Sequence, residues 1–178
     1  MKFIQMSLVL CLMLLCDSDV SYSQTVQAQP EKIFYIVRHA EKDTGNNPAL
    51  SSLGKQRAAD LREALKAVPI DRILVTPYRR TAMTGDSVRM DKNLKTSVYA
   101  ADLTGAGLEK CLAGLPASEN NFLIIGHSNT IPALIRKLGV KEFELEQLPE
   151  DAYDRLFILR IRKGNVVLEE KKFGTPTP

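Results

Sequence analysis

The sequence has few of the residues from which metal sites and disulfides are built. It contains two histidines and three cysteines, and none of them has the spacing of a zinc motif such as His-x-x-x-His or Cys-x-x-Cys. Cys11 and Cys16 lie close to the first residue, and Cys111 stands alone further on. We therefore expect no metal, no other cofactor and no internal disulfide in the body of the chain.

Long runs of like charge are absent as well. The formal net charge is +3, and no stretch carries five consecutive residues of one sign. This excludes the charge patterns that are typical of nucleic-acid-binding segments. The composition, with 44% hydrophobic and 25% charged residues, is ordinary for a globular protein of one domain.

An apolar run long enough for a membrane-spanning helix, about 20 residues, is also missing. The strongest run covers only residues 8–15. Together with the small residues up to Ser23, it predicts that residues 1–23 are a signal peptide cleaved near Ser23, and that the mature protein is periplasmic or secreted. A retained N-terminal anchor is the alternative. Cys16 would suggest a lipoprotein, but Leu15 before it is bulky where such signals carry a small residue.

Behind this segment the sequence predicts one domain at residues 32–173, between a polar lead-in at 24–31 and a tail at 174–178. Short apolar runs alternate there with helical patterns. Strands are expected at 33–37, 72–75, 97–99 and 122–125, and helices at 52–67, 78–88, 103–115 and 131–138. Residues 155–162 and 166–171 alternate polar and apolar side chains around a turn, which predicts a hairpin at a sheet edge. We therefore expect an α/β fold, a three-layer α/β/α sandwich whose mixed sheet is mostly parallel.

Each histidine directly follows a predicted buried strand. His39 follows residues 33–37, and His127 follows residues 122–125. The carboxyl ends of parallel strands in an open α/β sheet are where ligands bind. One histidine after a strand is commonly an ordinary polar loop residue, but two of them, with arginines beside and between them, indicate a shared site.

The arginines indicate what such a site binds. Arg38 precedes His39, and Arg79 and Arg80 stand at the junction of a predicted strand and helix. Guanidinium groups match the geometry of phosphate oxygens. A deprotonated imidazole can attack phosphorus while the cations neutralise the transferring group. The pattern therefore predicts phosphoryl transfer.

Four blocks in this order resemble the histidine phosphatase superfamily, in the branch 1 that includes phosphoglycerate mutases and small phosphohistidine phosphatases. They are Arg38-His39-Ala40-Glu41-Lys42, Leu50-Ser51-x-x-Gly54-x-x-Arg57-Ala58, Thr76-Pro77-Tyr78-Arg79-Arg80-x-x-x-Thr84 and Gly126-His127-Ser128-Asn129-Thr130. The resemblance extends over residues 32–173 and implies a phosphoglycerate mutase-like fold. It also implies that His39 is the phosphorylated nucleophile, with the phosphoryl oxygens held by Arg38, Arg80 and His127.

The sequence departs from this family at the proton donor. Mutase-type members carry a glutamate in an insertion that is short here, so mutase activity is not expected. Asp102, Glu41 or water is left to protonate the leaving group, and for Asp102 a helix cap is an equally good interpretation. Ser128, through a backbone amide or a helix cap, and Asn47 are further candidates for phosphate binding.

The resemblance implies a metal-independent hydrolase of phosphoric monoesters, of the histidine acid phosphatase type, that forms a phosphohistidine. Its substrate is a small phosphorylated molecule or a phosphoprotein. Two other functions stay open: a phosphohistidine-protein phosphatase, and a non-catalytic phosphate-binding module of the same fold.

Overall fold

The computed structural model describes residues 30–176, so the proposed signal peptide and residues 24–29 lie outside the described residues. Strands and helices alternate along the described part of the chain and end in a hairpin. The elements are β1 (Lys32–Arg38), α1 (Ser52–Ala64), β2 (Arg72–Val75), α2 (Arg79–Asp91), β3 (Lys95–Val98), α3 (Ala106–Ala113), β4 (Asn121–Gly126), α4 (Ile131–Lys137), β5 (Arg155–Arg162) and β6 (Asn165–Lys172). Between residues 30 and 176, none of the helices is both long and apolar enough to cross a bilayer.

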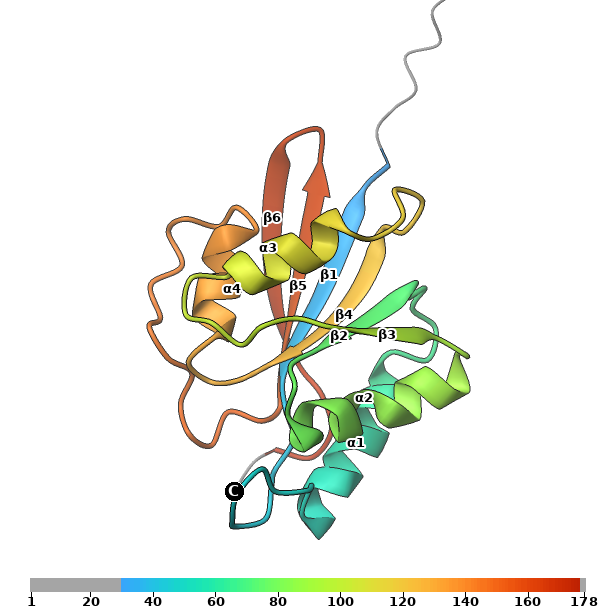
Figure 1. The fold of residues 1–178 in the computed structure, drawn as a ribbon, viewed down its shortest axis with the longest axis vertical. Coiled ribbons are helices and arrows are strands. Elements are labelled where there is room, and N and C mark those ends of the chain that lie inside the picture. The colour runs from blue at the N-terminus through green and yellow to red at the C-terminus, as the bar shows by residue number, and fades with distance from the viewer. Residues whose placement is uncertain (1–29, 177–178) are drawn as a thin grey trace, which may run out of the picture.

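The strands form a single six-stranded sheet in the order β3-β2-β4-β1-β5-β6 (Figure 1). β1, β2, β3 and β4 pair in parallel, whereas β5 runs antiparallel to β1 and β6 antiparallel to β5. The mostly parallel mixed sheet and the C-terminal hairpin predicted from the sequence are confirmed.

Helices cover both faces of the sheet, because successive residues of the buried strands point to opposite faces. On one face Phe34 and Ile36 of β1 belong to a core cluster that includes Leu108 of α3 and Leu134 of α4. On the other face, the neighbouring residues of β1 pack with α1 and α2 in a second cluster that includes Val37, Leu61 and Val88. Figure 1 shows the helices in the same two pairs. These layers form the predicted three-layer sandwich.

The element boundaries differ from the sequence-based expectation mainly at α3. The pattern predicts a helix from residue 103, but α3 begins at Ala106. Gly105 precedes it with φ of +75°, a left-handed conformation that interrupts a right-handed helix. The Asp102 side chain caps the helix by accepting hydrogen bonds from the amides of Ala106 and Gly107. Gly105, which falls inside the helix predicted from the sequence, and Asp102, which lies just before it, therefore mark the start of α3.

The pairing of β1 with β4 brings the two histidines together. Arg38 is in register with Gly126, so that His39 and His127 are the next residues on adjacent parallel strands. The amide of His39 donates to the Gly126 carbonyl at 2.9 Å and extends the ladder by one residue. After β1 the chain continues to α1 on one face, and after β4 it continues to α4 on the other, which opens a crevice between the strand ends.

The loop that follows His39 is held by the first turn of α1. The side chain of Ser51 accepts a hydrogen bond from the amide of Gly54 at 3.1 Å, as an N-cap does. The Ser51 amide donates to the Glu41 carbonyl at 3.0 Å. A Cβ atom on Gly54 would lie 1.9 Å from that same carbonyl oxygen, so only glycine permits this approach.

Replacing Gly54 with alanine should therefore destabilise the protein, although alanine is the better helix former. We expect the free energy of unfolding to fall by about 1–3 kcal/mol, as for other overpacked sites, in a urea titration. Gly114→Ala is the matched control, since the added Cβ meets its nearest atom at 3.6 Å and the backbone is right-handed. Equal stabilities of the two variants would contradict this account.

Candidate active site

A pocket of about 360 Å³ opens at the carboxyl ends of β1 and β4. Its lining is rich in cationic and neutral polar side chains and contains a single carboxylate. The lining residues are Arg38, His39, Lys42, Tyr78, Arg80, Ala101, His127, Ser128, Asn129, Thr130, Gln147 and Glu150. Such a lining attracts anions and repels metal cations.

The two imidazoles are adjacent and almost fully buried. Their ring centroids are 5.3 Å apart, with the ring planes inclined by 62°. His39 is 4% exposed and His127 is 7% exposed. The structure thus brings together the two histidines that the sequence separates by nearly half the chain, in an edge-on arrangement.

The imidazole of His39 is neutral and keeps a free lone pair. Its Nδ1 lies 2.8 Å from the carbonyl oxygen of Ala40, so the ring proton sits on Nδ1 and Nε2 keeps its lone pair. Burial lowers the pKa of His39 to about 3, against the opposing effect of that hydrogen bond. Electrostatic repulsion from the guanidiniums of Arg80 and Arg38, and from His127 when that ring is protonated, lowers it further. At neutral pH the ring is therefore uncharged, which is the form in which an imidazole can act as a nucleophile.

The hydrogen bonds of His127 fix its tautomer. The Arg80 Nη2 lies 3.2 Å from Nδ1, and the Thr76 Oγ1 lies 2.9 Å from Nε2. A guanidinium only donates, so Nδ1 accepts and the ring proton is on Nε2. Burial lowers the pKa of His127 to about 4, aided by the charges of Arg80 and Arg38. To donate to a phosphoryl oxygen the ring must gain a proton on Nδ1, which a bound dianion favours.

Thr76 is a site residue whose role the sequence interpretation did not assign. It directly follows β2, and its hydroxyl lies 3.0 Å from the hydroxyl of Thr81 in α2. The Thr81 hydroxyl in turn donates to the Thr76 and Tyr78 carbonyls. The available signal was its position at a strand end within the Thr76-Pro77 block. Thr76 orients the imidazole of His127 and does not itself line the pocket.

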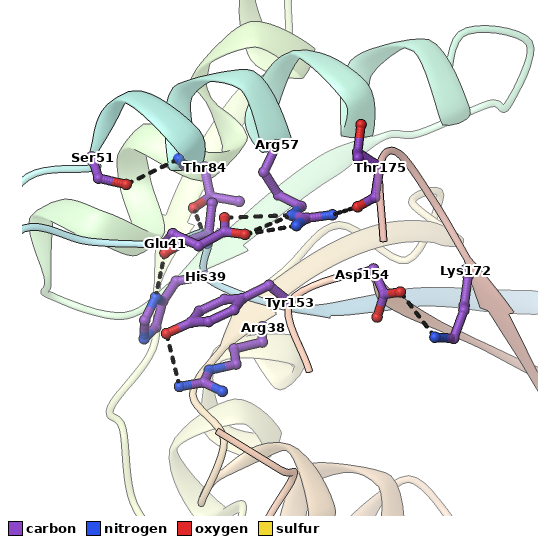
Figure 2. Close-up of polar contacts among 12 residues, drawn as sticks. Arg38, His39, Glu41, Ser51, Arg57, Thr84, Tyr153, Asp154, Lys172 and Thr175 are labelled. Atoms are coloured by element: carbon purple, nitrogen blue, oxygen red, sulfur yellow. Dashed lines mark hydrogen bonds and ion pairs between the residues drawn. The ribbon is translucent and has the colours of Figure 1, made fainter. Parts of the chain in front are cut away.

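The two arginines of the pocket each keep a nitrogen without a partner. Arg38 is 5% exposed, and its guanidinium stacks over the Tyr153 ring at 4.1 Å from the centroid (Figure 2). Arg80 lies over the Tyr78 ring at 4.4 Å, and burial lowers its pKa. Within the described residues the buried Nε of each arginine has no hydrogen-bond partner. Unpaired buried donors beside two imidazoles are suited to an oxyanion.

Asp102 is not placed to donate a proton, and here the helix-cap interpretation is the right one. Its carboxylate accepts hydrogen bonds from the hydroxyl and amide of Thr104 and from the amides of Ala106 and Gly107. The bond from the Thr104 hydroxyl, followed by that from the Gly107 amide, holds the pKa of Asp102 well below its usual range. A carboxylate that stays ionised and lies outside the pocket lining has no proton to give.

Glu41 is also turned away from the pocket, and the structure gives it a positioning role. Its Oε1 accepts from the Arg57 Nη2 at 2.7 Å and from Nε at 3.1 Å, within a nearly buried ion pair. Figure 2 shows Glu41 directed toward Arg57 on α1, while Arg57 also donates to the Thr175 carbonyl at 2.5 Å. This pair ties the loop after His39 to α1 and to the end of the described chain.

The two remaining predicted phosphate ligands are placed differently. Ser128 lines the pocket, next to His127. Asn47 does not line it; its side-chain oxygen accepts from the Arg79 amide at 3.0 Å. Asn47 therefore holds the loop before α1 against the N-terminus of α2, and a direct contact with phosphate is not what this geometry supports.

Comparison with known proteins bears on the same residues. The model of the histidine phosphatase superfamily (branch 1) matches residues 34–103. The family recognised from the sequence motifs is confirmed. The match includes His39 and Arg80, whereas His127 lies beyond it and is placed by the fold. No curated protein matches the sequence.

Solved structures share the histidine phosphatase fold at low identity. Glucosyl-3-phosphoglycerate phosphatase from a mycobacterium is 14% identical with a TM-score of 0.59, over 80% of this chain and 98% of that one. A protein from Nakamurella multipartitia, provisionally identified as the phosphohistidine phosphatase SixA, is 16% identical with a TM-score of 0.59, over 85% and 99%. Mycobacterial hydrolase 1 is 15% identical with a TM-score of 0.62, over 83% and 100%. At these identities the likeness establishes the fold.

Removing Arg57 should cost far more stability than removing an exposed arginine from the same helix. Arg57→Met leaves the Glu41 carboxylate buried without its partner, and we expect a loss of about 3–5 kcal/mol in urea unfolding. Arg62→Met, which breaks the exposed pair with Glu63, should cost about 0–1 kcal/mol. Adding Glu41→Gln to Arg57→Met should restore part of the loss. Similar losses for both single variants would contradict the buried-pair account.

The two histidine rings should not titrate near their ordinary range in the free protein. Because their pKa values are lowered to about 3 and about 4, the NMR signals of both rings should stay constant between about pH 8 and pH 5. Both rings then remain neutral until the solution is clearly acidic. The His39→Gln variant assigns the remaining signal. A ring that gains its proton around pH 6.5 would refute the proposed buried, cation-flanked environment.

Proposed function

We propose that this protein is a metal-independent phosphatase that hydrolyses phosphomonoesters through a phosphohistidine on His39. The observation that carries the proposal is the neutral His39 ring, 5.3 Å from His127, in one pocket with Arg38 and Arg80, whose buried Nε atoms have no partner among the described residues. The family match supports phosphatase chemistry in general. The finer assignment, a phosphoric monoester hydrolase of the histidine acid phosphatase type, is our own.

In the proposed reaction the Nε2 of His39 attacks phosphorus in line with the leaving oxygen. The guanidiniums of Arg38 and Arg80 bind the equatorial oxygens, and His127 joins them once a phosphate dianion has favoured its protonation. Water then attacks the phosphohistidine and releases phosphate. Positioning and charge neutralisation, which such a transfer mainly requires, are supplied by residues already held in place by β1, β4 and α2.

We also propose where the protein works and on what. A pocket that is open to solvent and lined by cations fits a small phosphorylated substrate or a phosphorylated protein side chain. The exposed Lys42 at the pocket wall adds a further cation. The N-terminal apolar run supports export to the periplasm or the exterior, with removal of residues 1–23.

A second candidate function is the dephosphorylation of phosphohistidine in proteins. It is favoured by the fold shared with the protein provisionally identified as SixA and by the openness of the pocket. Hydrolysis of a phosphohistidine peptide in clear preference to alkyl and aryl phosphates would select it over the first. Binding of inorganic phosphate without any turnover would instead indicate a non-catalytic module.

Substitutions of neighbouring residues test the main proposal. His39→Ala should abolish hydrolysis of p-nitrophenyl phosphate and the acid-labile phosphoenzyme trapped by rapid quenching. Arg80→Ala should lower turnover about 10²–10³-fold, as for other lost electrostatic donors. Arg79→Ala should leave it unchanged, since that exposed side chain lies outside the pocket lining. Wild-type turnover by His39→Ala would disprove a phosphohistidine mechanism.

A further inference from the structure

The carboxylate that lines the pocket belongs to Glu150, which the sequence motifs do not include. Glu150 lies in the loop between α4 and β5, more than a hundred residues after Arg38. It is the single acidic residue of the pocket lining, and its side chain is 76% exposed. A proton donor for the leaving group must reach the pocket, and neither Asp102 nor Glu41 does so.

Hydrogen bonds hold this carboxylate against the phosphate-binding wall. Its Oε2 accepts from the Arg38 Nη2 at 3.1 Å, and its Oε1 accepts from the Gln147 Nε2 at 2.8 Å. The backbone is fixed too, because the Arg38 Nη1 donates to the carbonyls of Pro149 and Glu150 at 3.0 and 2.8 Å. The position of the carboxylate is therefore determined by the arginine that precedes His39.

The same loop is anchored to the other half of the site. The Leu148 amide donates to the Ser128 carbonyl at 2.9 Å, next to His127. Leu148 itself is buried in the core cluster beneath α4. The loop thus spans from the His127 segment to Arg38, and the Glu150 side chain that it carries lines the pocket and stays exposed to solvent.

We propose that Glu150 is the acid–base residue of this site. The inference rests on the proposed phosphatase function and extends it by assigning the proton transfers. Glu150 gives its proton to the departing alcohol and takes one from the water that follows. Both transfers occur at the wall of the pocket lined by the carboxylate.

The proposed steps balance as follows. In the first, a bond forms between the His39 Nε2 and phosphorus, the bond from phosphorus to the ester oxygen breaks, and the Glu150 proton moves to that oxygen to give the alcohol. In the second, the Glu150 carboxylate removes a proton from water as the water oxygen bonds to phosphorus. The phosphorus–nitrogen bond breaks, and its electron pair returns to the imidazole. The proton taken from water leaves Glu150 protonated, as it was before the first step, and Glu150 becomes the carboxylate partner of Arg38 again once inorganic phosphate has left.

Substrate binding supplies a reason for Glu150 to carry a proton. In the free protein its carboxylate is the anion paired with Arg38. A phosphoryl dianion on the same guanidinium replaces that carboxylate as the counter-charge, and the repulsion between the two neighbouring anions is relieved when Glu150 carries a proton. When a substrate occupies the pocket, Glu150 is therefore in the protonated form that can transfer a proton.

Leaving groups of different acidity distinguish this role from a merely structural one. In Glu150→Gln the amide oxygen can still accept from Arg38, but no proton can be delivered. With an alkyl substrate such as glycerol phosphate we expect a loss of about 10²–10⁴-fold in kcat/KM, the usual contribution of general acid catalysis. With p-nitrophenyl phosphate, whose leaving anion needs no proton, kcat/KM should stay close to wild type.

The second proton transfer predicts a separate signature. In Glu150→Gln, hydrolysis of the phosphohistidine loses its base, so p-nitrophenol should appear in a pre-steady-state burst followed by slow turnover. The phosphoenzyme should accumulate in the same reaction. Glu146→Gln is the matched control, because Glu146 pairs with Arg136 outside the pocket lining, and it should behave as wild type with both substrates.

Two results would overturn the assignment. If Glu150→Gln lost the same factor in kcat/KM with glycerol phosphate and with p-nitrophenyl phosphate, Glu150 would only restrain Arg38. If kcat/KM and the steady-state turnover were unchanged with both substrates, Glu150 would take no part in the reaction. Failure of the proposed function itself gives a different result, since the wild-type protein would then form no phosphoenzyme with either substrate.

Discussion

The site depends on one backbone interaction, the parallel pairing of β1 with β4. Arg38 lies opposite Gly126, and a histidine follows each of these two residues. The two histidines are therefore neighbours at the same end of the sheet. A shift of one residue would turn one ring to the opposite face of the sheet. Both strands are buried on both faces by apolar clusters, which fixes the register firmly.

A second constraint is electrostatic. The pocket collects two guanidiniums and two imidazoles around a space with one carboxylate, and burial together with this charge keeps both rings neutral. Such an arrangement costs folding free energy that binding of an anion would recover. The polar contacts around the pocket fix its loops. The ion pair of Glu41 with Arg57 holds the segment after His39, and Asn47 holds the loop before α1 against α2.

Much of the fold and part of the site were predictable from local patterns. Short apolar runs predicted the strands, and the alternation after residue 155 predicted the edge hairpin. The roles of single carboxylates were not predictable. Asp102 and Glu41 are near the right motifs in sequence, but one caps α3 and the other pairs with Arg57. Which way a side chain turns depends on partners that are distant along the chain.

The sequence by itself determined the layered α/β architecture and predicted the two histidines and Arg38 as site residues, because hydrophobic periodicity and residue type at strand ends are local properties. The choice of Arg80 over Arg79 came from the family resemblance. Tertiary structure alone decided which groups meet. The tautomer of His127 follows from Arg80 and Thr76, and the presence of Glu150 at the pocket follows from a loop folded back onto Arg38. The local sequence does not reveal long-range contacts of this kind, because nothing in the neighbouring residues distinguishes either partner from any other polar residue.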